Sequence, residues 1–141
     1  MKLTSNLSLE EFVPKSTWLR HGDNAIWFIS KDIVLGAQVI RDYFNKSMSI
    51  NTWHIKGEFQ YRGYRPPEYT EGAYESDHRR GIAIDINIDG MLSDEVADAI
   101  IEKRDESFPW ITCIEDPTYT KGWTHISTRW TNQKDLLIVK P

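Results

Sequence analysis

The chain has 141 residues, which is enough for one domain with a single hydrophobic core but not for two. Hydrophobic residues make up 40% of it and charged residues 27%, an ordinary balance for a folded protein and not for a disordered one. The net charge of −4, with no lysine and arginine stripe and no glycine-rich phosphate loop, argues against nucleic acid as the main partner.

Capping patterns predict two helices in the first third of the chain. Ser8 and Glu11 form a capping box, so a short helix is expected from Ser8 to Val13, where Pro14 stops it. Ser30 precedes an amphipathic pattern that predicts a longer helix over residues 31–45.

The middle of the chain has an extended pattern. Residues 49–55 and 58–64 flank Lys56 and Gly57, and the glycine suits a tight turn, so these two runs are expected to pair as an antiparallel hairpin. The polar loop 69–76 then follows a pair of prolines, and we expect it to form a mobile lid.

The second half adds more strands and one helix. Ser93 is expected to cap a helix over residues 94–106, and strands are expected at 82–88, 110–115 and 123–128. The predicted fold is therefore α+β, a small antiparallel or mixed sheet with three helices packed around it, in a single domain that spans residues 1–141.

The strand at 82–88 shows a strict alternation of side chains. Its four isoleucines take one face, and small or polar residues take the other face: Gly81, Ala83, Asp85 and Asn87. Asp85 therefore shares its face with residues too small to block it. Glycine and alanine pack poorly in a strand, which indicates that something approaches the backbone closely there.

Two histidines complete a candidate metal site with Asp85. His78 lies shortly before the strand, and His125 shares a face of the last predicted strand with Trp123 and Ser127. Zinc accepts histidine nitrogen and aspartate oxygen, and a catalytic zinc keeps three protein ligands and one open position for water. Each residue taken singly is more often structural than a ligand, so the prediction rests on the ordered set His78, Asp85 and His125.

Four motifs carry a family resemblance. The segment 76–85 resembles the Ser-x-His-x-x-Gly-x-Ala-x-Asp signature of the zinc D-Ala-D-Ala carboxypeptidases, a family that includes vancomycin-resistance dipeptidases and phage L-alanyl-D-glutamate endolysins. Residues 123–125 resemble its closing Trp-x-His, residues 63–66 resemble its Gly-Tyr-Arg element, and residues 7–12 resemble the opening motif of its phage members. The resemblance spans about residues 5–130 and implies the hedgehog/DD-peptidase fold.

The resemblance also implies roles for individual residues. His78, Asp85 and His125 would bind Zn²⁺, and Arg65 would polarise or orient the carbonyl of the scissile bond, a task that suits a planar guanidinium. Further contacts with the substrate are expected from Arg62, which could also substitute for Arg65, and from Tyr64, Ser76 and Trp123.

The sequence departs from the family at one catalytic position. Many members carry an acidic general base three residues before the last histidine, where this chain has Gly122. The best substitute is Glu115 at the end of an apolar strand, since a carboxylate beside zinc could accept a proton from water and return it to the leaving amine. A structural role for Glu115, such as support for a histidine ligand, stays open.

Two functional classes follow. The first is a phage-type zinc peptidase that hydrolyses a short peptide bond of bacterial peptidoglycan, either L-Ala-D-Glu in the stem peptide or D-Ala-D-Ala at its end. The second is a non-catalytic phage structural or cell-wall-binding protein that keeps the peptidase fold. Gly122 favours the second class, and the retained set of ligands favours the first.

The remaining expectations concern the protein's surroundings. The single cysteine, Cys113, lies in an apolar run and is expected to be buried and free of any internal disulfide. No signal peptide or membrane span is recognised, so we expect the protein to be kept in the cytoplasm until lysis or to be carried in a virion. A monomer is expected as well.

Overall fold

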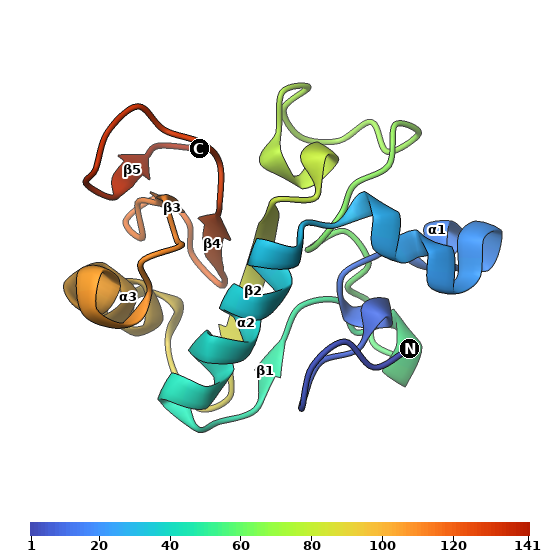
Figure 1. Cartoon of the computed structure of the whole chain (residues 1–141), viewed down its shortest axis with the longest axis horizontal. Coiled ribbons are helices and arrows are strands. Elements are labelled where there is room, and N and C mark those ends of the chain that lie inside the picture. The colour runs from blue at the N-terminus through green and yellow to red at the C-terminus, as the bar shows by residue number, and fades with distance from the viewer.

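The computed structural model covers residues 1–141 and has an α+β fold built on one mixed sheet of five short strands (Figure 1). The order across the sheet is β1-β2-β4-β3-β5, and only the β3–β5 pair is parallel. The predicted α+β class is confirmed. The strands are β1 (Met48–Ser49), β2 (Ala83–Ile88), β3 (Cys113–Glu115), β4 (Thr124–Ser127) and β5 (Leu137–Val139).

The longer helices agree closely with the sequence. α2 (Lys31–Phe44) begins after Ser30, whose hydroxyl accepts a hydrogen bond from the Asp32 amide at 3.2 Å, as a cap should. α3 (Ser93–Ser107) begins one residue earlier than predicted. The predicted cap at Ser93 is wrong, because its hydroxyl accepts a hydrogen bond from the Gly122 amide at 3.2 Å.

The N-terminal prediction needs a larger correction. The capping box exists, since the Glu11 carboxylate accepts the Ser8 amide at 2.7 Å, but it closes only a 3-10 turn, Leu9–Glu11. The turn ends before Pro14, with Phe12 as its C-cap, and Pro14 serves as the N-cap of α1 (Lys15–His21), whose first bond runs from the Trp18 amide to the Pro14 carbonyl. α1 and the 3-10 helix Gly22–Phe28 after it were not predicted, because seven-residue elements carry too little periodicity.

The predicted hairpin of 49–55 with 58–64 is wrong. β1 pairs with β2 instead, with Met48 opposite Ile88, and a 3-10 turn occupies Trp53–Ile55. The N-terminal segment takes the backbone bonds that a hairpin partner would have made, since Glu11 and Phe12 offer their carbonyls to the amides of Asn51 and Tyr64 at 3.1 and 2.7 Å.

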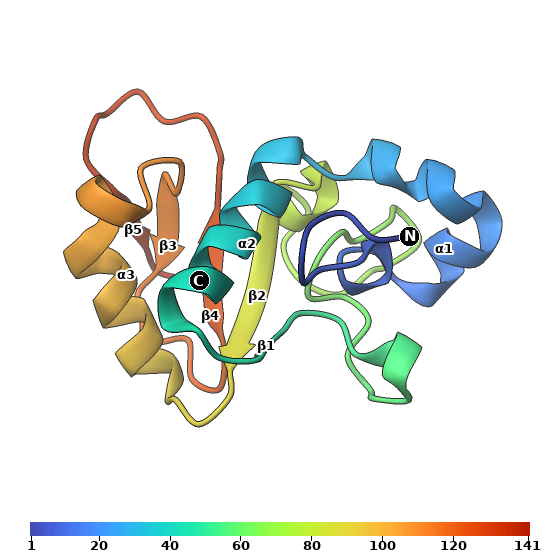
Figure 2. The ribbon, with the colours of Figure 1, turned by 60° about the horizontal axis from the view of Figure 1, so that its bottom comes forward.

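The helices and the candidate site occupy opposite faces of the sheet. α2 crosses one face and α3 lies beside β3 and β4, as both views show (Figures 1 and 2). Eighteen buried residues form the core there, among them Ile84 and Ile86 of β2. The other face of β2 presents Asp85 and is covered by the 3-10 helix Asp77–Arg80 and by loops, so the strand is almost wholly buried. No helix is long and apolar enough to cross a bilayer.

Candidate metal centre

The pairing of β2 with β4 brings two of the predicted ligands together. Asp85 lies directly opposite His125 in the antiparallel register, and both point to the face away from the helices. Only 5% of Asp85 and 7% of His125 is exposed. The contact between Asp85 and His125, which the sequence allowed but did not prove, is therefore present.

His78 reaches the same point from a short 3-10 helix, Asp77–Arg80. Ser76 caps this helix by accepting the His78 amide at 3.3 Å, and Gly81 ends it with a φ of 66°, a value that favours glycine. The His78 ring Nδ1 lies 2.8 Å from the Gly63 carbonyl oxygen, so Nδ1 carries the proton and donates it. The lone pair of Nε2 is then free to bind a cation.

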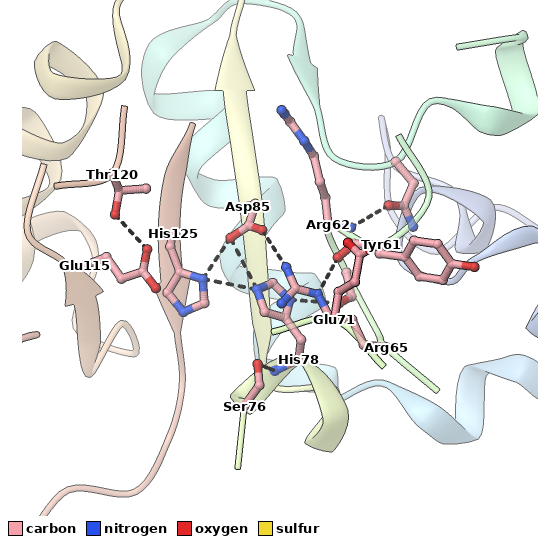
Figure 3. A network of polar contacts seen from close by, with 12 residues as sticks. Tyr61, Arg62, Arg65, Glu71, Ser76, His78, Asp85, Glu115, Thr120 and His125 are labelled. Carbon is pink, nitrogen blue, oxygen red and sulfur yellow. Dashed lines mark hydrogen bonds and ion pairs between the residues drawn. The ribbon is translucent and has the colours of Figure 1, made fainter. Parts of the chain in front are cut away.

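The three donor atoms form a small triangle (Figure 3). His78 Nε2 lies 3.1 Å from His125 Nδ1 and 3.2 Å from Asp85 Oδ1, and the last two atoms are 2.7 Å apart. Ligands at about 2.0–2.1 Å from a tetrahedral zinc are separated by roughly 3.4 Å, so an ion would fit after each side chain moved by a few tenths of an ångström. Two imidazole nitrogens and one carboxylate oxygen suit zinc.

Asp85 is the charged centre of this group. Burial raises the pKa of its carboxyl group, but the neighbouring His78 and His125 outweigh burial and hold the pKa well below its usual range. Its second oxygen, Oδ2, accepts a hydrogen bond from Arg65 Nη2 at 3.2 Å. One oxygen thus faces the histidines while the other is oriented by a cation.

The cluster forms the floor of an open cavity of about 650 Å³. Arg65, Ser76 and Trp123, all predicted site residues, line it as well, and part of the loop predicted as a lid forms its rim. Trp123 is 38% exposed and supplies an aromatic wall. A cavity of this size, with polar groups gathered at its floor, is typical of a small-molecule or peptide site.

Glu115 lies in the same row as the cluster. The β3–β4 register pairs Ile114 with Ile126, and one further step places Glu115 opposite His125, which is opposite Asp85. Glu115 Oε2 accepts a hydrogen bond from the Thr120 hydroxyl at 2.7 Å, and Glu115 lines the cavity (Figure 3). The predicted catalytic carboxylate is therefore next to the candidate metal ligands and is fixed by a neighbour.

Two predicted substrate-binding residues do not line the cavity. The Arg62 guanidinium donates to Asn87 and stacks over the Phe59 ring, 3.6 Å from its centroid. Tyr64 is 8% exposed and stacks on Phe28 with ring centroids 5.2 Å apart. Both side chains stabilise the fold around the site instead of facing a ligand.

Other residues at the cavity were missed. Arg129, which follows β4, donates from Nε to the buried Asp77 at 2.6 Å, and Thr120 holds Glu115. Burial opposes the charge of Arg129, but Asp77 outweighs it and raises the pKa of the guanidinium. Arg129 is four residues after His125, so side-chain alternation would place both on the same face of the strand and its extension. This alternation is the sequence signal that could have predicted Arg129 as a cavity residue.

The other histidines and the cysteine lie elsewhere. His21 packs edge-on against Phe28, with ring centroids 4.9 Å apart, and His54 is exposed on the Trp53–Ile55 turn. Cys113 is fully buried and free, as predicted, and burial raises the pKa of its thiol.

No protein-family model, curated protein or solved structure matches this chain. The resemblance to the zinc D-Ala-D-Ala carboxypeptidases stays a prediction from the motifs.

Proposed function

We propose that the chain is a zinc-dependent peptidase that hydrolyses a short peptide bond of bacterial peptidoglycan, either L-Ala-D-Glu or D-Ala-D-Ala. The observation that carries the proposal is the convergence of His78, Asp85 and His125, whose donor atoms lie 2.7–3.2 Å apart at the floor of a cavity. A carboxylate, Glu115, and a guanidinium, Arg65, line that cavity too. Together these groups provide a metal site, a base and a cation for the carbonyl.

Glu115 acts as the general base. When bound, zinc would supply a Lewis acid that polarises the scissile carbonyl and makes water more acidic. The Thr120 hydroxyl fixes Oε2 of Glu115 at 2.7 Å, which leaves Oε1 to accept the proton of the attacking water. Glu115 then returns this proton to the leaving amine, so that the amide bond breaks without building up charge on nitrogen.

Arg65 orients the substrate carbonyl. Its Nε donates to the Tyr61 carbonyl at 2.8 Å and its Nη2 to Asp85 at 3.2 Å, so the guanidinium is held in place at the cavity wall. Nη1 makes no hydrogen bond within the protein and can donate to a carbonyl oxygen as negative charge develops on it. A fixed donor of this kind needs no reorganisation during the reaction.

A second candidate function is binding to the cell wall without hydrolysis. Gly122 favours it, because no acid stands three residues before His125 and the space around Gly122 is open. In this alternative Glu115 is structural, and its bond with Thr120 only ties β3 to the loop that follows it.

Digestion of purified stem peptides separates the two candidates. The zinc-loaded protein is expected to release a new amino group, and Glu115→Gln is expected to lower kcat by about 100-fold or more with its zinc content unchanged. Glu71→Gln, which alters an exposed glutamate of the rim loop, is the matched control and should behave as wild type. Zinc-loaded protein that binds the peptides without cleaving them would establish the second candidate, and equal cleavage by Glu115→Gln would remove Glu115 as the base.

A further inference from the structure

A second cation at the cavity, Arg129, has no role in the chemistry described so far. Its Nε is bound to Asp77, which is 2% exposed and directly precedes His78. The buried carboxylate of Asp77 therefore fixes the Arg129 guanidinium in the cavity of the three candidate metal ligands and keeps it charged.

The outer end of this guanidinium is free. Neither terminal nitrogen of Arg129 forms a hydrogen bond within the protein, the side chain is 36% exposed, and the residue lines the cavity. Two parallel N–H groups at the end of a fixed arginine match the two oxygens of a carboxylate. The side chain is thus prepared to bind an anion that enters the cavity.

A second basic side chain shares the cavity with Arg129. Lys140 lines the same cavity and lies 5.2 Å above the Tyr119 ring, and it forms no ion pair with a carboxylate. Two of the acids that line the cavity are held in ion pairs with arginines, Asp77 with Arg129 and Glu75 with Arg80 at 2.7 Å. Asp116 lies near Lys140, which helps to lower the pKa of that carboxyl group after the hydrogen bonds from Thr118. The cavity therefore has two basic side chains at Arg129 and Lys140, and the terminal nitrogens of Arg129 have no partner within the protein.

The geometry of β4 sets how far Arg129 lies along the backbone from the candidate metal ligand His125. Alternation along β4 continues past Ser127, so Arg129 follows His125 on the same face, roughly 13 Å away along the backbone at about 3.3 Å per residue. The Arg129 side chain points toward the 3-10 helix Asp77–Arg80, because its Nε bonds to Asp77, the residue directly before His78. Its free end and the three candidate ligands line the same cavity, so a substrate held at the ligands would extend along that cavity toward Arg129.

We propose that Arg129, assisted by Lys140, binds a free carboxylate on the leaving residue of the substrate; this inference rests on the proposed peptidase function. Both candidate bonds have such a group, namely the terminal carboxylate of D-Ala-D-Ala and the α-carboxylate of a γ-linked D-Glu. The substrate class is then a stem peptide whose carboxylate is free. Peptides in which that carboxylate is amidated lose the ion pair and are poor substrates.

The test compares peptide pairs that differ only in a carboxylate or carboxamide at this position. Wild type should cleave the free acid with a kcat/KM about 10 to 100 times that of the amide, mainly through KM, as expected for a charge-assisted hydrogen bond. Arg129→Gln should reduce this preference to about one, and Arg129→Lys should keep part of it. Arg20→Gln, an exposed arginine whose partner Glu68 also lies outside the cavity, is the matched control.

Two further measurements test the role of Arg129 even if Arg129→Gln folds poorly or wild type cleaves neither peptide. Arg129→Gln leaves Asp77 buried and unpaired, so the double variant Asp77→Asn with Arg129→Gln is measured beside it to recover folding. Calorimetric binding of the leaving fragment, D-Glu or D-Ala, and of its amide needs no turnover, so it tests Arg129 even if wild type cleaves neither peptide and the proposed function fails. Equal binding of acid and amide by wild type, or an unchanged preference in Arg129→Gln, would overturn the inference.

Discussion

The two oxygens of Asp85 have different partners, and this division organises the site. Oδ1 lies 2.7 Å from His125 and 3.2 Å from His78, while Oδ2 accepts from Arg65. The depressed pKa of this carboxyl group means that it is ionised at neutral pH and presents a negative charge toward the histidines. A cation bound there would be held by one charge and two lone pairs.

The first prediction concerns the ligands. Zinc-loaded wild type is expected to contain about one ion per chain, and His78→Ala and His125→Ala are each expected to lose it, because each removes one of three donors. Elemental analysis after dialysis measures the content. His54→Ala is the matched control, since His54 is exposed and outside the cavity, and it should keep its zinc. Retention of zinc in both ligand variants would mean that the ion binds elsewhere.

For single residues, the sequence predicted which three side chains come together as candidate ligands, but it did not predict which residues cover the other predicted site residues. Alternation along 82–88 selected Asp85, and the order of the motifs selected His78 and His125. Strand parity says which face a residue takes, but it does not say what covers that face. Tyr64, predicted to contact substrate, lies outside the cavity lining because its ring stacks on Phe28, which belongs to a 3-10 helix that has no sequence signal.

Among the elements, the junction between the 3-10 helix Asp77–Arg80 and β2 does most to position His78. Gly81 sits there with a φ of 66°, and its carbonyl accepts the Ser30 amide at 2.8 Å, which ties the junction to the start of α2. A Cβ at this position would lie 1.9 Å from the Phe28 carbonyl oxygen. The glycine predicted to mark a close backbone approach does so.

The second prediction tests this junction. Gly81→Ala is expected to lower the free energy of unfolding by about 2–4 kcal/mol, the sum of left-handed strain and overpacking. Gly90→Ala is the control, because its φ of 72° is similar but only the flexible end of Lys46 is near, so about 1 kcal/mol is expected. Urea unfolding of both variants measures the difference. Equal losses of unfolding free energy in Gly81→Ala and Gly90→Ala would show that a Cβ close to the Phe28 carbonyl does not destabilise the fold.

Strand partners were less predictable than strand positions. The runs at 49–55 and 58–64 do meet at a turn, since the Thr52 amide bonds to the Phe59 carbonyl at 2.8 Å and the Gly57 amide to the Thr52 carbonyl at 2.9 Å. They form no ladder beyond it, and Trp53–Ile55 is a 3-10 turn. Their pairing failed because the N-terminal segment competes for the same backbone groups, and such competition depends on tertiary packing and not on local propensity. β5, which joins the sheet in parallel beside β3, was not predicted at all, because three residues are too few to show an alternating pattern.

In the whole molecule, the core and the candidate site lie on opposite sides of one sheet. The isoleucines of β2 pack with α2 and α3, whereas Asp85 and His125 face the cavity. The fold therefore has a source of stability that does not depend on a metal, unlike small domains that have no core and unfold without their ion.

The last prediction follows from this separation. Protein treated with a chelator is expected to keep its far-UV circular dichroism and to unfold cooperatively, because the eighteen-residue core is intact. Added zinc should then raise the melting temperature with increasing concentration, since an ion that binds only the folded state contributes about 2.7 kcal/mol at 100 times its Kd. The double variant His78→Ala with His125→Ala should melt at a temperature that zinc does not change. Loss of all secondary structure on chelation would mean instead that the metal ligands, and not the isoleucine core, hold the sheet together.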